Sequence, residues 1–196
     1  MRKKIVILGS TGSIGTTLLD IINKDKNNFE IILLSAQKNY KKLFNQAKKF
    51  NVKNIVITDP KYFEIAINIK NKSNLKIYNN FNDLDKIIKK KIDYSMISIS
   101  GIDGLNPTIK LIKHSKKIAI ANKEAIICGW NLIKNQLKKF KTEFLPVDSE
   151  HFSIWYALKK NNKINNIDKI FLTASGGPFI NLPLSKLKDV KISLAL

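Results

Sequence analysis

Two carboxylates, Asp148 and Glu150, flank Ser149 in the segment PVDSEH (residues 146–151), directly after an apolar run. If this segment is extended, residues i and i+2 lie on one face and the carboxylates converge. Converging carboxylates repel each other unless a cation lies between them, and oxygen ligands without a nearby cysteine favour Mg²⁺ or Mn²⁺. Alternatively, Asp148 and Ser149 cap a helix that begins here. The chemistry of these residues leaves both interpretations open.

A glycine-rich segment, GSTGSIG, follows the first apolar run and precedes a helical pattern. Its glycines, Gly9, Gly12 and Gly15, would permit a tight turn and a close approach of the backbone to a ligand. The N–H groups at the start of the following helix would receive a pyrophosphate. The spacing differs from the usual G-x-G-x-x-G, but its position between an N-terminal strand and a helix favours a dinucleotide site over a turn that serves packing alone.

The end of the second predicted strand indicates which dinucleotide is preferred. Proteins that bind NAD usually place an Asp or Glu about 20 residues past the glycines, where it holds the ribose 2′-hydroxyl. The matching segment, LLSAQKNY (residues 33–40), contains no acid but includes Gln37, Lys38 and Asn39. Lysine and amide donors would hold a 2′-phosphate that an acid would repel. We therefore expect NADPH rather than NADH, although Lys38 could equally be one of many solvated lysines.

Two further segments place polar groups after predicted strands, where open α/β sheets bind ligands. SGIDGLNPT (residues 100–108) is a glycine turn before a helix. ANKEA (residues 121–125) contributes an amide, a cation and an acid at Asn122, Lys123 and Glu124. On spacing alone, this second segment is better explained as a helix cap and first turn.

A possible phosphate site lies in LTASGGPF (residues 172–179), where Ser175 and the backbone N–H groups could bind an anion. In isolation, a simple glycine turn is the better explanation. Cys128 lies on the apolar face of a predicted helix and is expected in the core. His114 ends another predicted helix beside lysines, and neither residue is assigned a catalytic role.

Short β-branched runs alternate with amphipathic segments, which favours βαβ units and a mostly parallel sheet. Strands are expected at residues 3–8, 29–36, 54–58, 75–78, 94–100, 117–121, 143–147 and 169–174. Helices are expected at residues 16–24, 39–50, 83–90 and 124–140. We predict a Rossmann-like, doubly wound α/β domain that binds NADPH over residues 1–142. Residues 143–196 would begin an incomplete α/β catalytic domain.

The composition describes a globular protein with a strongly basic surface. Its 196 residues carry a formal net charge of +20, almost all of it from scattered lysine, because Arg2 is the only arginine. The scarcity of arginine argues against specific nucleic-acid recognition. A single cysteine excludes an internal disulfide and fits a reducing compartment. No apolar run approaches the roughly 20 residues of a membrane span, and no signal-peptide pattern is present. We expect a cytoplasmic protein without nucleic-acid or membrane partners.

In order and spacing, GSTGSIG, ANKE, LPVDSEH and LTASGGPF resemble the motifs of the 1-deoxy-D-xylulose 5-phosphate reductoisomerase family. The resemblance implies an enzyme that uses NADPH and Mg²⁺ or Mn²⁺. It implies the rearrangement and reduction of a phosphorylated sugar, 1-deoxy-D-xylulose 5-phosphate, to 2-C-methyl-D-erythritol 4-phosphate in non-mevalonate isoprenoid biosynthesis. It also implies a homodimer in the full-length enzyme.

The same resemblance implies roles for individual residues. Positions that match cofactor contacts of the family are Thr11, Gly12, Ser13, Ile14, Gln37, Lys38, Asn39, Asn122 and Glu124. Positions that match substrate contacts are Lys123, Ser149, Glu150 and Ser175. Asp148 and Glu150 match two metal ligands of the catalytic centre.

This chain departs from the family pattern in three places. Gln37 stands where a glycine is usual, and Ile180 follows GGPF where a basic residue is common. The later motifs of the family, which carry a third metal ligand and phosphate contacts, are missing. We therefore expect an N-terminal portion of the enzyme that is inactive alone. The alternative is a non-catalytic NADPH-binding module or a decayed fragment.

Overall fold

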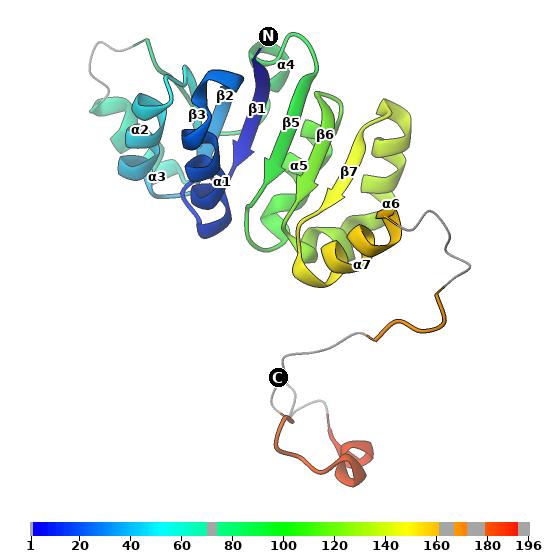
Figure 1. Cartoon of the computed structure of the whole chain (residues 1–196). Helices are drawn as coiled ribbons and strands as arrows, with labels where there is room; N and C mark the ends of the chain where they lie inside the picture. Colours follow the sequence, from blue (N-terminus) through cyan, green and yellow to red (C-terminus); the bar gives the residue numbers. More distant parts are fainter. Residues whose placement is uncertain (1, 70–73, 161–166, 172–178, 192–196) are drawn as a thin grey trace. The chain divides into compact units, whose positions relative to one another are not determined.

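The fold is an α/β structure built around one parallel sheet (Figure 1). The computed structural model describes residues 2–69, 74–160, 167–171 and 179–191. The chain divides into two compact units, Met1–Phe152 and Ser153–Leu196, and the first unit contains the sheet. The predicted Rossmann-like fold class is confirmed.

Seven parallel strands form the sheet in the spatial order β4-β3-β2-β1-β5-β6-β7. The strands are β1 (Lys3–Leu8), β2 (Phe29–Ala36), β3 (Asn54–Ile57), β4 (Lys76–Tyr78), β5 (Ile92–Ile97), β6 (Ser115–Ile120) and β7 (Glu143–Pro146). The chain builds outward from β1 to β4 and then returns to place β5 on the other side of β1. This reversal of strand order creates a crevice at the carboxyl ends of the strands, the usual ligand position in such sheets.

Helices connect the strands, and polar caps explain where several of them begin. The α-helices are α1 (Ser13–Lys24), α2 (Tyr40–Lys49), α3 (Pro60–Asn68), α4 (Leu84–Ile87), α5 (Leu105–Ile112), α6 (Lys123–Phe140) and α7 (Ser149–Lys160). Short 3₁₀ helices are η1 (Lys26–Asn28), η2 (Ile102–Gly104) and η4 (Leu184–Asp189). Asn39, Asp59 and Asn122 each accept a hydrogen bond from the first turn of α2, α3 or α6. Among the described residues, no helix has both the length and the apolar composition that crossing a membrane requires.

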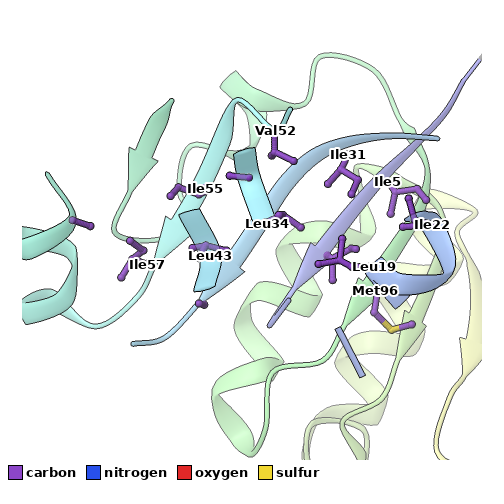
Figure 2. Packing of buried hydrophobic residues seen from close by; sticks show 14 of the residues in the cluster. Ile5, Leu19, Ile22, Ile31, Leu34, Leu43, Val52, Ile55, Ile57 and Met96 are labelled. Atoms are coloured by element: carbon purple, nitrogen blue, oxygen red, sulfur yellow. The ribbon is translucent and has the colours of Figure 1, made fainter. Parts of the chain in front are cut away.

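Alternating side chains of the strands fill two cores, one on each face of the sheet. On β1, Ile5 and Ile7 pack into the core under α1, α2 and α3, which is shown in Figure 2. Val6 and Leu8 point the other way, into the core under α4, α5 and α6. Successive residues of a strand face opposite sides, so a sheet covered on both faces needs continuous apolar runs. Burying one such side chain contributes roughly 1.5–3 kcal/mol.

The first seven predicted strands are present, with ends that differ from the predicted ones by up to three residues, the largest difference being at β5, which ends at Ile97 and not at residue 100. The eighth predicted strand, residues 169–174, differs: residues 169–171 have no regular structure, and residues 172–174 lie outside the described residues. β7 pairs with β6 and extends the sheet, so the segment assigned to the second domain begins within the first compact unit. A functional division after residue 142 stays a prediction.

Asp93 links three neighbouring strands near the start of β5. Its carboxylate accepts a hydrogen bond from the Lys4 N–H group of β1 at 2.8 Å and another from Lys116 Nζ of β6 at 2.7 Å. The hydrogen bond from Lys116, followed by the one from Lys4, holds the pKa of Asp93 below its ordinary value, although burial opposes this shift. The ionised carboxylate therefore stabilises the order β1-β5-β6.

We predict that Asp93→Asn lowers the free energy of unfolding at neutral pH but changes it little at about pH 2. A lowered pKa in the folded chain gives stability that is present above the ordinary carboxylate range and is lost as the pH falls through the lowered pKa. Urea denaturation of both proteins at the two pH values measures this. Asp20→Asn, which changes an exposed acid of α1, is the control. A loss of equal size at both pH values would contradict the assignment.

Candidate functional site

The turn between β1 and α1 (Figure 1) depends on glycine at two positions. Gly9 has φ of +79°, and a Cβ atom there would lie 2.4 Å from the carbonyl oxygen of Ser98 on the segment after β5. A Cβ atom at Gly15 would lie 2.5 Å from the Cα atom of Ser10. Only glycine permits these approaches, which bring the end of β1 against the segment after β5 and the start of α1 against the end of β1.

Buried polar side chains hold this turn from α2 and β2. Gln46 of α2 is 8% exposed; its Oε1 accepts from Ser10 Oγ at 2.8 Å and its Nε2 donates to the Ser10 carbonyl at 2.9 Å. Ser35 of β2 accepts from the Gly9 N–H group through Oγ at 2.9 Å, and its carbonyl accepts from the Ser10 N–H group at 2.8 Å. A buried network whose members are all paired rigidifies the segment that it holds.

Sequence reasoning missed Gln46 and Ser10 as residues that shape the site. The signal available for Gln46 was an amide at a position where the period of α2 calls for an apolar residue, next to Leu43 and Ala47 in the buried set. Such an amide must find a partner inside the protein. The sequence does not say which partner, because Ser10 and Gln46 meet only when α2 packs beside the turn.

A cavity of about 380 Å³ opens beside the turn, at the carboxyl ends of the strands. Its walls come from the last residues of β2 and from the segments that follow β1, β2, β3, β4 and β5. The lining residues are Gly9, Thr11, Gly12, Ser35, Ala36, Gln37, Thr58, Phe81, Ser98, Ile99, Ser100 and Asp103. The crevice that the strand order implies is therefore present. Ser100 and Asp103 belong to SGIDGLNPT, a segment for which the sequence predicts a ligand position, whereas Thr58 and Phe81 are lining residues that sequence reasoning did not single out.

The predicted cofactor residues occupy different places around this cavity. Thr11, Gly12 and Gln37 line it. Ser13 and Ile14 form the first turn of α1; the residue before them, Gly12, carries no side chain that could cap their N–H groups, which suits an anion at this helix end.

Lys38 and Asn39 lie between β2 and α2. Lys38 is exposed, whereas the Oδ1 atom of Asn39 accepts from the Lys42 N–H group at 3.1 Å and so caps α2.

Asn122 acts as a structural link at the start of α6. It is 3% exposed, its Oδ1 accepts from the Ala125 N–H group at 2.8 Å, and its Nδ2 donates to the carbonyls of Ile99 and Gly101. Asn122 therefore caps α6 and ties it to the glycine turn after β5. Lys123 and Glu124 are exposed in the first turn of α6. All three are described residues, and they lie outside the lining of the cavity.

The acidic segment after β7 forms a helix cap. α7 begins at Ser149, and Asp148 Oδ1 accepts from the His151 N–H group at 3.2 Å. The same oxygen lies 2.6 Å from Nδ1 of the His151 ring, and Ser149 Oγ donates to Glu150 Oε2 at 2.9 Å. The segment is thus a first helical turn and not an extended strand, as the capping alternative expected.

The two carboxylates nevertheless lie close enough to influence each other. Burial raises the pKa of Asp148, but the hydrogen bonds from the ring and the N–H group of His151 outweigh burial, and the pKa lies below its ordinary value. The charge of His151 and a hydrogen bond with the Glu150 carboxyl act in the same direction. Asp148 is therefore ionised at neutral pH, beside a second carboxyl group.

The donor set at this segment fits a divalent cation in type but not in number. Carboxylate oxygens suit Mg²⁺ or Mn²⁺, which require about six ligands. Within the parts of the chain that the structure describes, no three His, Cys, Asp or Glu side chains gather in an arrangement that could hold a metal ion. Asp148 and Glu150 would thus hold a cation together with other oxygen ligands.

Three remaining sequence expectations have different outcomes. Ser175 lies outside the described residues. Cys128 is exposed on α6, so its expected place in the core is wrong. His114, which was expected at the end of a helix, is buried just after α5. Burial lowers the pKa of His114, although the neighbouring Asp85 opposes this shift.

Comparison with protein-family models places both parts of the chain. Residues 5–129 match the model described as 1-deoxy-D-xylulose 5-phosphate reductoisomerase, and residues 144–196 match the model for the C-terminal domain of the same protein. The chain belongs to the 1-deoxy-D-xylulose 5-phosphate reductoisomerase family.

Relatives and solved structures of this reductoisomerase family agree with the match. The 1-deoxy-D-xylulose 5-phosphate reductoisomerase of Pelagibacter ubique is 59% identical over 196 residues, which cover 99% of this chain and 50% of that protein. The structure of the Zymomonas mobilis reductoisomerase in complex with NADPH is 32% identical, with a TM-score of 0.82 over 97% of this chain and 50% of that one. A reductoisomerase in complex with NADPH, fosmidomycin and magnesium is 28% identical, with a TM-score of 0.78 over 98% of this chain and 50% of that one. The chain spans about half the length of the curated relatives that it matches.

We predict that Gln46→Leu lowers the free energy of unfolding by about 1–3 kcal/mol, because it removes the amide that binds the buried Ser10 carbonyl and leaves the Ser10 hydroxyl with only the Ser35 carbonyl, at 3.2 Å. Urea denaturation measures this change. Gln37→Leu, the same substitution at an exposed position, should change the free energy by less than about 0.5 kcal/mol. Equal effects of the two substitutions would show that Gln46 does not hold the turn.

Proposed function

We propose that this chain forms the NADPH-binding and metal-binding part of an enzyme that converts 1-deoxy-D-xylulose 5-phosphate to 2-C-methyl-D-erythritol 4-phosphate. The observation that carries the proposal is the cavity beside the glycine turn, together with the absence of an acid from the segment at the end of β2 (residues 33–40). The 59% identity to a reductoisomerase supports the reaction. The chain alone, which lacks the later motifs, would bind the cofactor without turnover.

The turn after β1 and the end of β2 would hold NADPH at two charged groups. The first N–H groups of α1, at Ser13 and Ile14, would receive the pyrophosphate, because the N-terminus of a helix attracts an anion. Gln37, Lys38 and Asn39 would surround the 2′-phosphate. When bound, NADPH supplies the hydride for the reduction step. Family resemblance adds contacts from Asn122 and Glu124.

The segment after β7 would bind the metal ion and the substrate. Asp148 and Glu150 would hold Mg²⁺ or Mn²⁺, which would supply Lewis acidity for the reaction when bound. Lys123 would donate a hydrogen bond to the substrate, Ser149 Oγ would accept one from a substrate hydroxyl, and Ser175 would contribute to its phosphate site. The Ser149 hydroxyl already donates to Glu150 at 2.9 Å, so one side chain would join a metal ligand to the substrate.

The family resemblance also leads us to infer that the whole protein is a homodimer that works in the cytoplasm, without nucleic-acid or membrane partners. Light scattering at several protein concentrations would measure its mass. A mass that stays at that of one chain would contradict the dimer.

We predict that Asp148→Asn and Glu150→Gln, each in the whole protein, lower the rate of NADPH oxidation by more than about 100-fold, because each removes a metal ligand. NADPH absorbance with 1-deoxy-D-xylulose 5-phosphate and Mn²⁺ measures the rate, and fluorescence titration measures the dissociation constant of NADPH. That constant should change less than about twofold, since the acids lie outside the cofactor cavity.

Glu64→Gln, which alters an exposed acid of α3, is the matched control and should keep both properties. If Asp148 only caps α7, Asp148→Asn should keep most of the rate of NADPH oxidation, because asparagine caps a helix about as well as aspartate. If the unsubstituted whole protein binds NADPH but does not turn over, it is the non-catalytic binding module.

A further inference from the structure

Lys42 of α2 reaches the glycine turn with its ammonium group. The Nζ atom donates to the Thr11 carbonyl at 2.9 Å and to Thr16 Oγ1 at 2.9 Å. Thr16 Oγ1 in turn donates to the Gly12 carbonyl at 2.7 Å. An ammonium group has three N–H donors, and these contacts use two of them. Lys42 is therefore fixed beside the turn with one donor left for a ligand.

The positive charge of Lys42 is not neutralised by a carboxylate. In the described parts of the chain, none of the ion pairs includes Lys42, and its two hydrogen-bond acceptors are neutral oxygens. Thr11, whose carbonyl holds it, lines the cavity. A partly buried cation without a counter-ion, beside a cavity, favours an anionic ligand.

The position of α2 indicates which anionic group of a dinucleotide Lys42 would meet. α2 is the helix that follows β2. In a dinucleotide site, the ribose 2′ position lies on this side, whereas the pyrophosphate lies at the N-terminus of α1. Asn39 accepts from the Lys42 N–H group and so fixes the backbone of the lysine on this side. Asp59 is an acid that follows β3 next to this segment. Its carboxylate is engaged as the cap of α3, where it accepts from the Tyr62 N–H group at 3.3 Å.

We propose that Lys42 binds the adenosine 2′-phosphate of the cofactor and helps the protein to prefer NADPH over NADH. This inference rests on the proposed use of NADPH. Lys38, the cation that the sequence pattern indicated, is exposed, and no hydrogen bond or ion pair with another described residue holds its side chain. Lys42 loses less conformational freedom on binding than Lys38, because its side chain is already held.

The test measures the dissociation constants of NADPH and NADH for the whole protein by fluorescence titration. Lys42→Met should weaken NADPH binding about tenfold and change NADH binding less than about twofold, as expected for one charged hydrogen bond to the 2′-phosphate. Lys41→Met changes the net charge equally at the exposed neighbouring lysine and should leave both constants within about twofold. Lys42→Arg keeps the charge and should keep the preference.

A second variant separates the charge from the support of the turn. Thr16→Val keeps the lysine but removes one of its two anchors, so it should weaken NADPH binding by a smaller factor than Lys42→Met and leave NADH binding unchanged. This variant also decides the matter if Lys42→Met does not fold.

The outcomes that would overturn the inference differ from those that would overturn the proposed function. Equal weakening of NADPH and NADH would show that Lys42 only supports the turn, and no weakening would show that it does not touch the cofactor. In both cases the proposed cofactor stands if the unsubstituted protein still prefers NADPH. An unsubstituted protein that binds neither dinucleotide, or binds NADH as tightly as NADPH, would contradict the proposed cofactor itself.

Discussion

The close approach of two backbones, at Gly9 and at the carbonyl of Ser98, is the constraint on which the site depends. A side chain at Gly9 would separate the end of β1 from the segment after β5. These strands are neighbours only because the chain reverses its strand order at β1. The tight turn and the cavity therefore both depend on the crossing of the chain from β4 to β5. The proposed cofactor site follows from the topology of the sheet.

Polar contacts then fix the position of the turn that glycine allows. Gln46 and Ser35 bind its backbone from α2 and β2, and Ser98 Oγ donates to the carbonyls of Leu8 and Gly9 from the side of β5. The apolar cores hold the strands in place, but they do not orient peptide groups. The hydrogen bonds supply that orientation, and they also hold α2 where the ammonium group of Lys42 lies next to the turn.

Local patterns allowed the prediction of the sheet, of the glycine turn and, from the lack of an acid after β2, of NADPH. Each of these depends on residues that are consecutive in the sequence. The roles of Gln46 and Lys42 depend on how α2 packs against α1 and β2, which no local pattern reports. The segment at Asp148 was ambiguous for a physical reason: the same carboxylate can cap a helix or bind a cation, and the structure shows the cap. Cys128 was misplaced because the apolar period of α6 does not distinguish the buried side from its exposed neighbour.

The alternation of β1 between two cores has a consequence for how this gene can change. Adding or deleting one codon within the strand would exchange Ile5 and Ile7 with Val6 and Leu8, and it would shift Gly9 away from Ser98. Both hydrophobic cores and the turn would then fail together. Point substitutions can accumulate along this stretch, as long as they keep apolar side chains, but its length is fixed. Over evolutionary time, the number of residues from the start of β1 to the turn should change less than the amino acids at these positions.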